Sequence, residues 1–374
     1  MTNLGKWDCV VIGGGVMGAC IAWGMARAGV KPLVLDEGDL ARRASRTNFA
    51  MVFASGKGVG FPAYAMWCKS AIERWPQFAA DLEAESGIDV ELRQLGGLSF
   101  CMSQEELEEQ AGGRARIARE TGGQAAKYEV LDQQALRKRV PSIGPSVQGA
   151  IFSEQDGHAN PLRLLYALHA AMVARGCRYY ADHGVRTIEP ASSGFRILGE
   201  WGEVWAGKVV LAGGTDNQRL APMVGMACPL TRDKGQILVT ERCAPFFPYS
   251  SALICQSETG GITIGSSSDA VSESILTSQP LSAVLAKRAI QAFPALAALN
   301  IVRTWTGFRI MPPDGFPIYE QSASEPGAFV FASHSGISLA SNHVLELAPR
   351  ILAGRLGTDL AEFHSGRFRV SQAH

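Results

Sequence analysis

The stretch that decides the fold is residues 8–38, DCVVIGGGVMGACIAWGMARAGVKPLVLDEG. Residues 9–12 are apolar and partly β-branched, which predicts a short buried parallel strand. Three consecutive glycines and a helix-like run follow this strand. Residues 31–35 then predict a second strand, which ends in Asp36. A strand, a glycine turn, a helix, a second strand and a terminal acid in this order predict a dinucleotide-binding unit.

Each glycine of the GxGxxG turn has its own task. Gly13 allows a tight turn, and Gly15 lets the backbone approach a pyrophosphate. Gly18 lets the helix pack closely on the strand, and the pyrophosphate would lie at the positive end of that helix. Asp36 can accept hydrogen bonds from ribose hydroxyls, which implies an unphosphorylated ribose.

Two other interpretations of this stretch explain less. A glycine-lined contact between packed helices would not account for Asp36. A signal peptide or membrane span would fit the uncharged residues 9–26. However, the consecutive glycines break such a helix, and no basic segment precedes it. We therefore expect no membrane span.

The composition is that of a well-packed cytoplasmic enzyme. The 374 residues carry no net charge and 19% charged side chains, with no Lys/Arg block. This balance argues against nucleic acid or a membrane surface as a partner. The eight cysteines include no C-x-x-C pair and no metal-like spacing, so we expect free thiols and no metal site. The length predicts two domains.

Further helices and strands are predicted along the rest of the chain. Proline near the start and glycine at the end mark the helix at 161–176, in which we interpret His169 as a packed residue. The polar loop at 42–51 could donate hydrogen bonds to a phosphate or a flavin ring. Helices are predicted at 63–85, 104–120 and 280–293, and strands within 90–102 and at 208–212, 235–241 and 261–265.

A set of motifs along nearly the whole chain resembles the D-amino acid oxidase superfamily of FAD enzymes. The likeness is to glycine and sarcosine oxidases and, more narrowly, to the flavoprotein β-subunits of proline, hydroxyproline and opine dehydrogenases or oxidases. Besides the N-terminal unit, the motifs are ASRTN (44–48), DGHANPLRLLYAL (156–168), VVLAGG (209–214), KGQILVTE (234–241), WTGFR (305–309), PPDGFP (312–317) and SHSGISLA (333–340).

The resemblance implies an α/β fold of two parts. The first is a GR2-type, Rossmann-like FAD-binding domain formed by residues 1–85, 145–220 and 300–374. The second is an inserted α+β substrate domain with a mixed sheet, formed by residues 86–144 and 221–299.

The resemblance also implies which residues hold a non-covalent FAD. A helix that begins near Leu339 would aim its positive end at the part of the flavin ring that becomes anionic on reduction. The implied contacts are Gly13, Gly15, Val16, Met17, Gly18, Asp36 and Glu37 at the ADP moiety; Arg43, Ala44, Ser45, Thr47, Asn48, Ala50 and Met51 along the pyrophosphate and ring; Val185 at the adenine; Ala212, Gly213 and Gly214 at a close backbone approach; and Arg309, Ser335, Gly336, Ile337 and Ser338 near the ring.

Arg309 matches the family arginine that binds a substrate carboxylate, and a guanidinium suits a bidentate contact with planar oxygens. The alternative is that Arg309 pairs with Asp314 and fixes the PPDG turn. His334 either lines the active site or forms a hydrogen bond within the core. Gln236 is a further catalytic candidate and His158 a weaker one, because both fall within family motifs.

The implied reaction is oxidation of an amino or imino acid that carries a carboxylate. A hydride would pass from Cα to flavin N5, and the resulting imine would hydrolyse. No side-chain base is required if the amine binds neutral. The electron acceptor would be either O2 or a partner redox subunit. A non-catalytic flavin-binding subunit and an NAD-dependent dehydrogenase are the alternatives.

Five departures from the family pattern matter. Ala50 stands where many relatives carry glycine, so the loop could pack differently on the ring. The short SHSG form favours the proline, hydroxyproline or opine group, and the absence of cysteine there disfavours a covalent flavin. Asp36 stands where relatives often have Glu, which still suits a ribose. Pro349 is expected to kink or end the last helix early.

Overall fold

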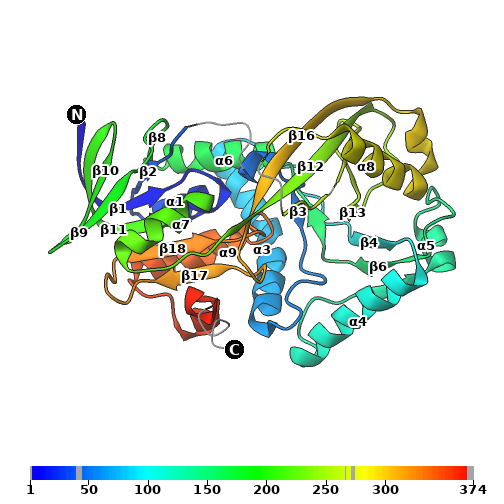
Figure 1. Cartoon of the computed structure of the whole chain (residues 1–374), viewed down its shortest axis with the longest axis horizontal. Helices are drawn as coiled ribbons and strands as arrows, with labels where there is room; N and C mark the ends of the chain where they lie inside the picture. Colours follow the sequence, from blue (N-terminus) through cyan, green and yellow to red (C-terminus); the bar gives the residue numbers. More distant parts are fainter. Residues whose placement is uncertain (1, 39–43, 266, 271–273, 369–374) are drawn as a thin grey trace.

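The computed structural model describes residues 2–38, 44–265, 267–270 and 274–368. Its strands form two large mixed sheets, one toward each end of the long axis of the molecule (Figure 1). The long strands β12 (Thr231–Arg242) and β16 (Ile301–Met311) run between the two ends. They pair antiparallel with each other over most of their length.

The first sheet contains the dinucleotide-binding unit. Strand β1 pairs in parallel with β2 on one side and with β11 on the other. The order is β17 (Ile318–Gln321), β18 (Ala328–Ala332), β11 (Gly202–Leu211), β1 (Thr2–Ile12), β2 (Leu33–Leu35) and β8 (Arg178–Tyr180), with β10 (Gly194–Gly199) joining β11 to β9 (Thr187–Ala191).

The interior half of β1 is buried on both faces, as expected for a central parallel strand. Cys9 and Val11 pack with helices α1 (Val16–Arg27), α3 (Pro62–Ser86) and α6 (Pro161–Ala174). Val10 and Ile12 pack on the opposite face, in a separate cluster that includes α7 (Asn217–Leu220). Two hydrophobic layers therefore enclose the strand that leads to the glycine turn.

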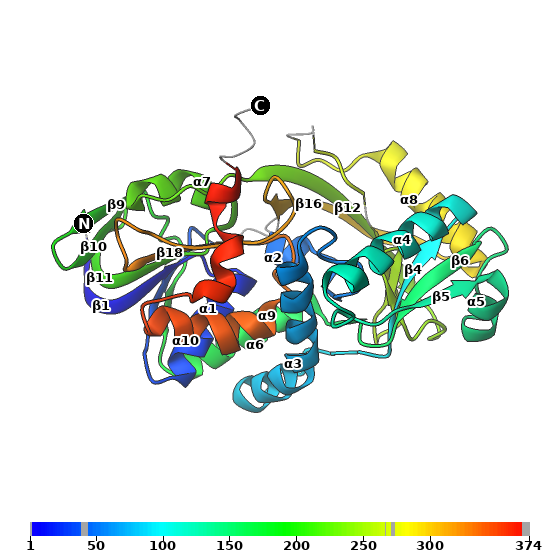
Figure 2. The ribbon, with the colours of Figure 1, turned by 90° about the horizontal axis from the view of Figure 1, so that it is seen from below.

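The second sheet lies beside long helices at its outer end (Figure 2). It follows the order β16, β12, β15 (Gly261–Ile264), β14 (Ile254–Gln256), β13 (Ser250–Ser251), β4 (Gly97–Cys101), β6 (Gly149–Ser153) and β5 (Glu129–Asp132). The helices α4 (Gln104–Glu120), α5 (Gln133–Arg139) and α8 (Gln279–Ala292) accompany it. Strands β6 and β16 belong to this sheet, although they come from ranges predicted for the FAD-binding domain. The predicted domain boundaries stay a prediction.

Several strands differ from the sequence prediction; β11 and β12, for example, begin at Gly202 and Thr231 rather than at residues 208 and 235. Strand β1 begins at Thr2 rather than at residue 9, because its polar and exposed first half also pairs with β11. The strand expected within residues 90–102 is confined to β4. Glu91 and Gly96 have φ values of 55° and 110°, which interrupt extended backbone before β4.

The last helix passes through Pro349 instead of ending before it. It starts as α9 (Ala340–Asn342), continues through a π turn at His343–Leu347 and finishes as α10 (Ala348–Leu352). In the π turn, the Ala348 N–H donates to the carbonyl of His343. We attribute this wider turn to Pro349, which has no N–H to donate and crowds the preceding turn.

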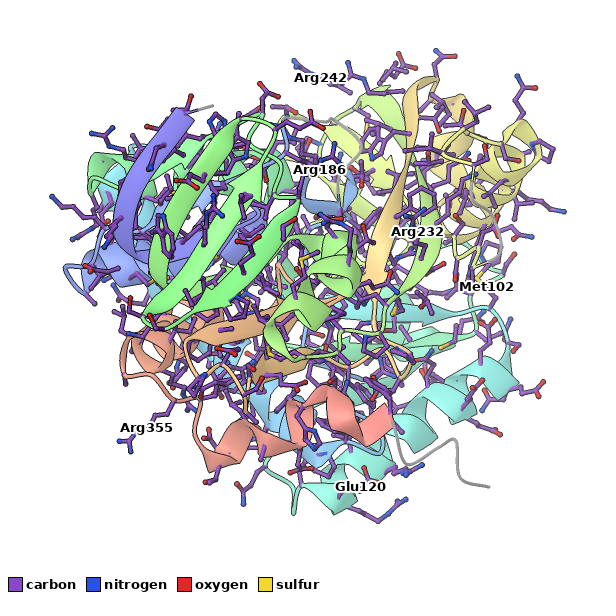
Figure 3. The ribbon with its side chains drawn as sticks, turned by 60° about the vertical axis from the view of Figure 1, so that its left-hand side comes forward. Met102, Glu120, Arg186, Arg232, Arg242 and Arg355 are labelled. Atoms are coloured by element: carbon purple, nitrogen blue, oxygen red, sulfur yellow. The ribbon has the colours of Figure 1, made fainter. Side chains whose placement is uncertain are left out.

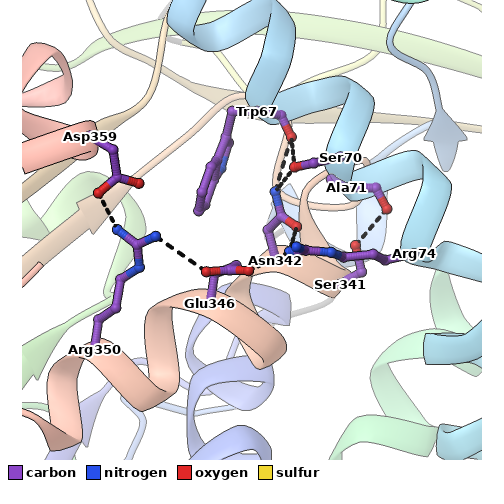
Figure 4. Close-up of polar contacts among 9 residues, drawn as sticks. All are labelled: Trp67, Ser70, Ala71, Arg74, Ser341, Asn342, Glu346, Arg350 and Asp359. Atoms are coloured by element: carbon purple, nitrogen blue, oxygen red, sulfur yellow. Dashed lines mark hydrogen bonds and ion pairs between the residues drawn. The ribbon is translucent and has the colours of Figure 1, made fainter. Parts of the chain in front are cut away.

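Side-chain contacts fix this last helix to α3 (Figure 4). The Asn342 amide donates to the Trp67 carbonyl at 3.0 Å, and the Ser341 hydroxyl donates to the Ala71 carbonyl at 2.6 Å. Arg74 donates to Asn342 at 3.0 Å and pairs with Glu346 at 2.7 Å. The start of the helix, directly after the SHSGIS segment, is therefore held in place by α3.

The outer surface carries dispersed charge. The side chains of Glu120, Arg186, Arg232, Arg242 and Arg355 are exposed, and their labels lie apart from one another in Figure 3. Among the helices of the described ranges, none combines the length and the apolar composition that crossing a bilayer requires.

Candidate active site

The glycine turn at the end of β1 leaves no room for side chains. Gly13 has a φ of 104°, and a Cβ added there would lie 2.5 Å from the Ala212 carbonyl oxygen. A Cβ on Gly15 would lie 2.8 Å from the Ser45 hydroxyl, and one on Gly18 would overlap the Gly13 carbonyl. The backbone of this turn can therefore approach a ligand closely.

Helix α1 begins directly after the turn, with Val16 and Met17 as its first residues and Gly15 at its N-cap. Its first turn contains no acidic residue. The Val16 N–H donates to the Ser45 hydroxyl at 3.0 Å. An N-terminus without acids and with a neutral cap favours a nearby anion.

Asp36 lies at the end of β2 and is buried against the glycine turn. Its carboxylate accepts the Gly14 N–H at 2.6 Å and the Gly38 N–H at 3.0 Å, whereas the neighbouring Glu37 is exposed. His169 also reaches this turn, because its Nε2–H donates to the Gly14 carbonyl at 2.7 Å. The sequence interpretation of His169 as a packed helix residue missed this contact.

The polar loop after the second strand is fixed by its own asparagine. Within the described part of this loop, helix α2 (Ala44–Thr47) is followed by β3 (Met51–Val52). The Asn48 amide donates to the carbonyls of Ala44 and Ser45, and its oxygen accepts the Ala50 N–H. Ala50 has a φ of 59°, which explains why glycine suits this position. Arg43 lies outside the described residues.

The Ala212–Gly214 run, Thr47 and Val185, which were also predicted to contact FAD, lie in three different places. Ala212 follows β11 and donates its N–H to the Ile12 carbonyl at 2.8 Å, so the Ala212–Gly213–Gly214 run lies beside the glycine turn. Thr47 is buried against β16, where a Cβ on Gly307 would overlap it. The carbonyl of Val185 is engaged by Arg219 at 2.7 Å.

A lysine donates hydrogen bonds to two serine hydroxyls of the SHSGIS segment. The Lys57 ammonium donates to the hydroxyls of Ser335 and Ser338 at 2.6 Å and 3.2 Å. Tyr64 donates to Ser335 at 2.8 Å. Gly336 has open space where a Cβ would stand, and the Ile337 carbonyl accepts from a buried tryptophan of α3.

Arg309 is paired, but not with the residue that the alternative interpretation named. Its guanidinium donates to the Asp233 carboxylate at 2.7 Å and to the Ser267 carbonyl at 2.8 Å. Asp233 stands opposite Arg309 in the register of β12 and β16. Asp314 instead pairs with Arg367 at 2.7 Å, so the Arg309–Asp314 pair is wrong.

His334 is exposed, yet burial of the surrounding region, followed by the charges of Lys57 and Arg309, lowers its pKa to about 4. The imidazole is therefore neutral near pH 7. The structure brings Arg309 and His334 into each other's field, and the catalytic role of either residue stays a prediction.

Gln236 forms hydrogen bonds at the start of α8, and His158 lies in a short strand that pairs with β3. The Gln236 amide donates to the Ser278 carbonyl and the Ser282 hydroxyl, and its oxygen accepts the Ser278 N–H. This bonding fixes the start of α8 and uses both N–H groups of the amide, and a catalytic role of Gln236 stays a prediction. His158 lies in β7 (Gly157–His158), paired with β3, and burial lowers its pKa to about 4.

Sequence reasoning missed Lys57 and Asp233. One signal for Lys57 was present, because it is the only charged residue between Thr47 and Cys68. Asp233 carried no local signal, since its contact with Arg309 depends on the pairing of two distant strands. A hollow beside α10, lined by residues such as Arg350, Leu356 and Asp359, contains none of the predicted site residues.

Comparisons with known proteins agree with this geometry. Residues 8–343 match the family described as FAD dependent oxidoreductase (DAO). The chain is 50% identical to one subunit of the opine oxidase of Rhizobium meliloti and to the same subunit in Agrobacterium tumefaciens (strain Ach5), over 98% of this chain and 99% of each relative.

Solved structures show the same fold. Glycine oxidase from Geobacillus kaustophilus superposes with a TM-score of 0.88 at 24% identity, over 96% of this chain and 98% of that one. L-Proline dehydrogenase from P. horikoshii gives a TM-score of 0.83 at 20% identity, over 98% of both chains. These likenesses confirm the predicted α/β fold class. The chain belongs to the DAO family of FAD-dependent oxidoreductases.

Proposed function

We propose that this enzyme oxidises the C–N bond of an opine, a secondary amine in which an amino acid nitrogen carries a second carboxyl-bearing arm. The observation that carries the proposal is the 50% identity to the opine oxidase subunits over almost the full length of both chains. Arg309 on β16 and His334 in the SHSGIS segment supply groups suited to such a substrate.

The residues present fit FAD. The glycine turn is bare where a Cβ would clash, helix α1 has no acid in its first turn, and Asp36 is fixed at the end of β2. We propose that Gly13, Gly15, Gly18, Ser45 and Asp36 hold the ADP moiety, and that the SHSGIS segment lies at the flavin ring. Bound FAD supplies the acceptor for a hydride from the substrate Cα.

Arg309 would hold a substrate carboxylate. Two of its N–H groups are engaged by Asp233 and Ser267, and a guanidinium has five such groups, so others remain for a carboxylate. The Asp233 contact limits the rotation of the guanidinium and so orients it. The neutral His334 imidazole adds a polar group beside the bound amine without adding a repelling charge. Orientation of a neutral amine requires no side-chain base.

We further propose that the chain works with a partner redox subunit in the cytoplasm. The relatives at 50% identity are each named as one subunit of an opine oxidase, which suits an enzyme of more than one chain. The cysteines are free, and most are buried, which suits a reducing compartment.

The test is anaerobic mixing of the FAD-loaded protein with a panel of opines, sarcosine, proline, hydroxyproline and D-amino acids, followed by absorbance of the flavin band. We expect opines to bleach the flavin. Recovery on admission of air would identify a free-standing oxidase, and slow recovery would indicate a partner acceptor. Failure of every opine to bleach an FAD-loaded protein, with or without its partner subunit, would refute the proposal.

A matched pair of variants locates the carboxylate contact. Arg309→Met removes the guanidinium, and we expect kcat/KM for the active opine to fall by about a hundredfold or more, because a bidentate charged contact is lost. Arg186→Met removes an exposed arginine that pairs with exposed Glu200 and should leave kcat/KM unchanged. Equal losses in both variants would argue against the assigned role of Arg309.

A further inference from the structure

The SHSGIS segment starts at the same edge of the first sheet as the glycine turn. Strands β1, β11 and β18 run parallel, and Ile12, Leu211 and Val330 are level with one another in their register. The carboxyl ends of the three strands therefore meet at one edge, which is where open parallel sheets bind their ligands. Strand β18 lies two strand spacings, about 10 Å, from β1, and the ribityl arm of FAD can bridge such a separation.

Within this segment the hydroxyl of Ser335 is buried and accepts two hydrogen bonds. The Lys57 ammonium donates to it at 2.6 Å, and the Tyr64 hydroxyl donates to it at 2.8 Å. A hydroxyl has two lone pairs and one hydrogen, so both lone pairs are used. Among the described residues, no atom accepts the remaining hydrogen, which points away from Lys57 and Tyr64.

The hydroxyl of Ser338 differs, because its bonding capacity is filled by protein atoms. It donates to the Met51 carbonyl at 2.9 Å, and it accepts from the Phe53 N–H at 3.3 Å and from Lys57 at 3.2 Å. A buried donor without an acceptor is costly. The free hydrogen of Ser335 therefore indicates an acceptor on a ligand beside the segment.

Lys57 brings a positive charge to this hydroxyl. Within the described ranges no ion pair joins Lys57 to an acid, although Asp156 is near enough to act on it. Burial lowers the pKa of Lys57, as expected for a cation that protein atoms desolvate. A negative charge that develops beside Ser335 would offset this desolvation. The same ammonium polarises the hydroxyl and makes it a stronger donor.

We propose that Ser335 donates its free hydroxyl hydrogen to the flavin ring, and that Lys57 is the positioning residue that aims this hydrogen and favours the reduced, anionic ring. A donor aimed at the place where negative charge develops stabilises that charge. The inference rests on the proposed function, which places the SHSGIS segment at the ring. A lysine that only holds the Ser335–Ser338 turn in shape is the competing explanation.

The two explanations differ in the reduction potential of the bound flavin. A structural lysine supports oxidised and reduced FAD equally, so its loss weakens both by one factor and leaves the potential unchanged. A donor that favours the anionic form changes the ratio of the two affinities, and with it the potential. The potential is measured by chemical reduction against a reference dye, without substrate, for the FAD-loaded wild type, Lys57→Met, Lys57→Arg, Ser335→Ala and Lys6→Met. Lys6 is exposed on β1 and serves as the control.

We expect Lys57→Met and Ser335→Ala each to lower the preference for reduced FAD by about tenfold, because a charge-assisted hydrogen bond is lost. For a two-electron couple this factor is a potential lower by about 30 mV. Lys57→Arg should keep most of the preference, and Lys6→Met all of it. Unchanged potentials in Lys57→Met and Ser335→Ala would overturn the proposal. Should Lys57→Met fail to fold, Ser335→Ala decides, because it removes a single oxygen.

This test is independent of the substrate. Bleaching by opines decides the proposed function, whereas the potential under a chemical reductant decides the roles of Ser335 and Lys57. A protein that opines bleach, but whose potential is the same in every variant, refutes this inference alone. Shifted potentials in a protein that opines do not bleach would refute the proposed substrate and support the assigned donor.

Discussion

The proposed dinucleotide side and the proposed substrate side of this site are built in different ways. The dinucleotide side consists mainly of backbone: a turn with no side chains, the N-terminus of α1, and one carboxylate that binds two N–H groups. The proposed substrate side consists of charged side chains from distant segments, such as Arg309 of β16 and its partner Asp233 of β12.

This difference teaches where each side is vulnerable. A backbone site tolerates changes of charge nearby but not the addition of atoms, because its geometry leaves no space. A side-chain site tolerates small changes of volume but depends on which charges are paired. Variants that add atoms to one side, or remove a charged group from it, test the comparison.

The largest effect is expected where atoms are added to the dinucleotide side. Gly13→Ala places a Cβ 2.5 Å from the Ala212 carbonyl oxygen at a φ of 104°. We expect a loss of stability on the order of 3 kcal/mol, since both strain and overlap must be relieved. The flavin-to-protein ratio of the purified protein and its Tm are the measurements, and the ratio should fall below about a tenth of the wild-type value.

The matched control is Gly112→Ala in α4, where an added Cβ meets no atom within 4 Å. Alanine is favoured over glycine inside a helix, so this variant should be as stable as the wild type or more so by about 0.5–1 kcal/mol. Full flavin content in Gly13→Ala would show that the turn has more freedom than the structure indicates.

A smaller effect is expected from Asp36, the one side chain on which the dinucleotide side depends. Asp36→Ala leaves the N–H groups of Gly14 and Gly38 without their carboxylate and removes the proposed ribose contact. We expect FAD affinity to fall by about ten- to a hundredfold, because hydrogen bonds to charged groups are among the stronger ones. FAD titration followed by fluorescence quenching measures it.

The same variant separates the two sides when FAD is saturating. KM for the active opine should then match that of the wild type, because Arg309 and Asp233 are unchanged. A parallel rise in KM would mean that the two sides are not independent, and the comparison would fail.

The sequence predicted the dinucleotide side well because its information is local. Strand, turn, helix and Asp36 all lie within residues 8–38, and each follows from residue type and spacing. The long first half of β1 was missed, since its pairing with β11 is a tertiary contact between polar, exposed residues. Asn48 was expected beside the cofactor, but its amide nitrogen donates to two carbonyls of its own loop.

The substrate side could be predicted only in part. Arg309 was recognised by its motif, but its partner lies 76 residues away and is set by the register of two strands. Gln236 lies in a family motif, yet it caps α8 through contacts 42 and 46 residues distant. Such pairings have no periodic or local signature, so a single sequence cannot supply them.

The smallest effect concerns pH and comes from the buried Asp156. Burial raises the pKa of Asp156 from 3.8 to about 6, although the N–H groups of Ala54 and Ser55 favour the ionised form. The folded protein thus holds the proton more tightly than the unfolded chain does. The contribution of Asp156 to stability is complete below pH 4, is lost as the pH rises to about 6, and is constant above it.

Asp156→Asn isolates this contribution, because an amide oxygen can still accept both backbone N–H groups and carries no charge at any pH. We expect Tm of the wild type minus Tm of the variant to decrease by a few degrees as the pH rises from 4 to 6, and to stay level from 6 to 8. A difference that rises with pH would mean that Lys57 and Arg114 stabilise the carboxylate more than burial destabilises it.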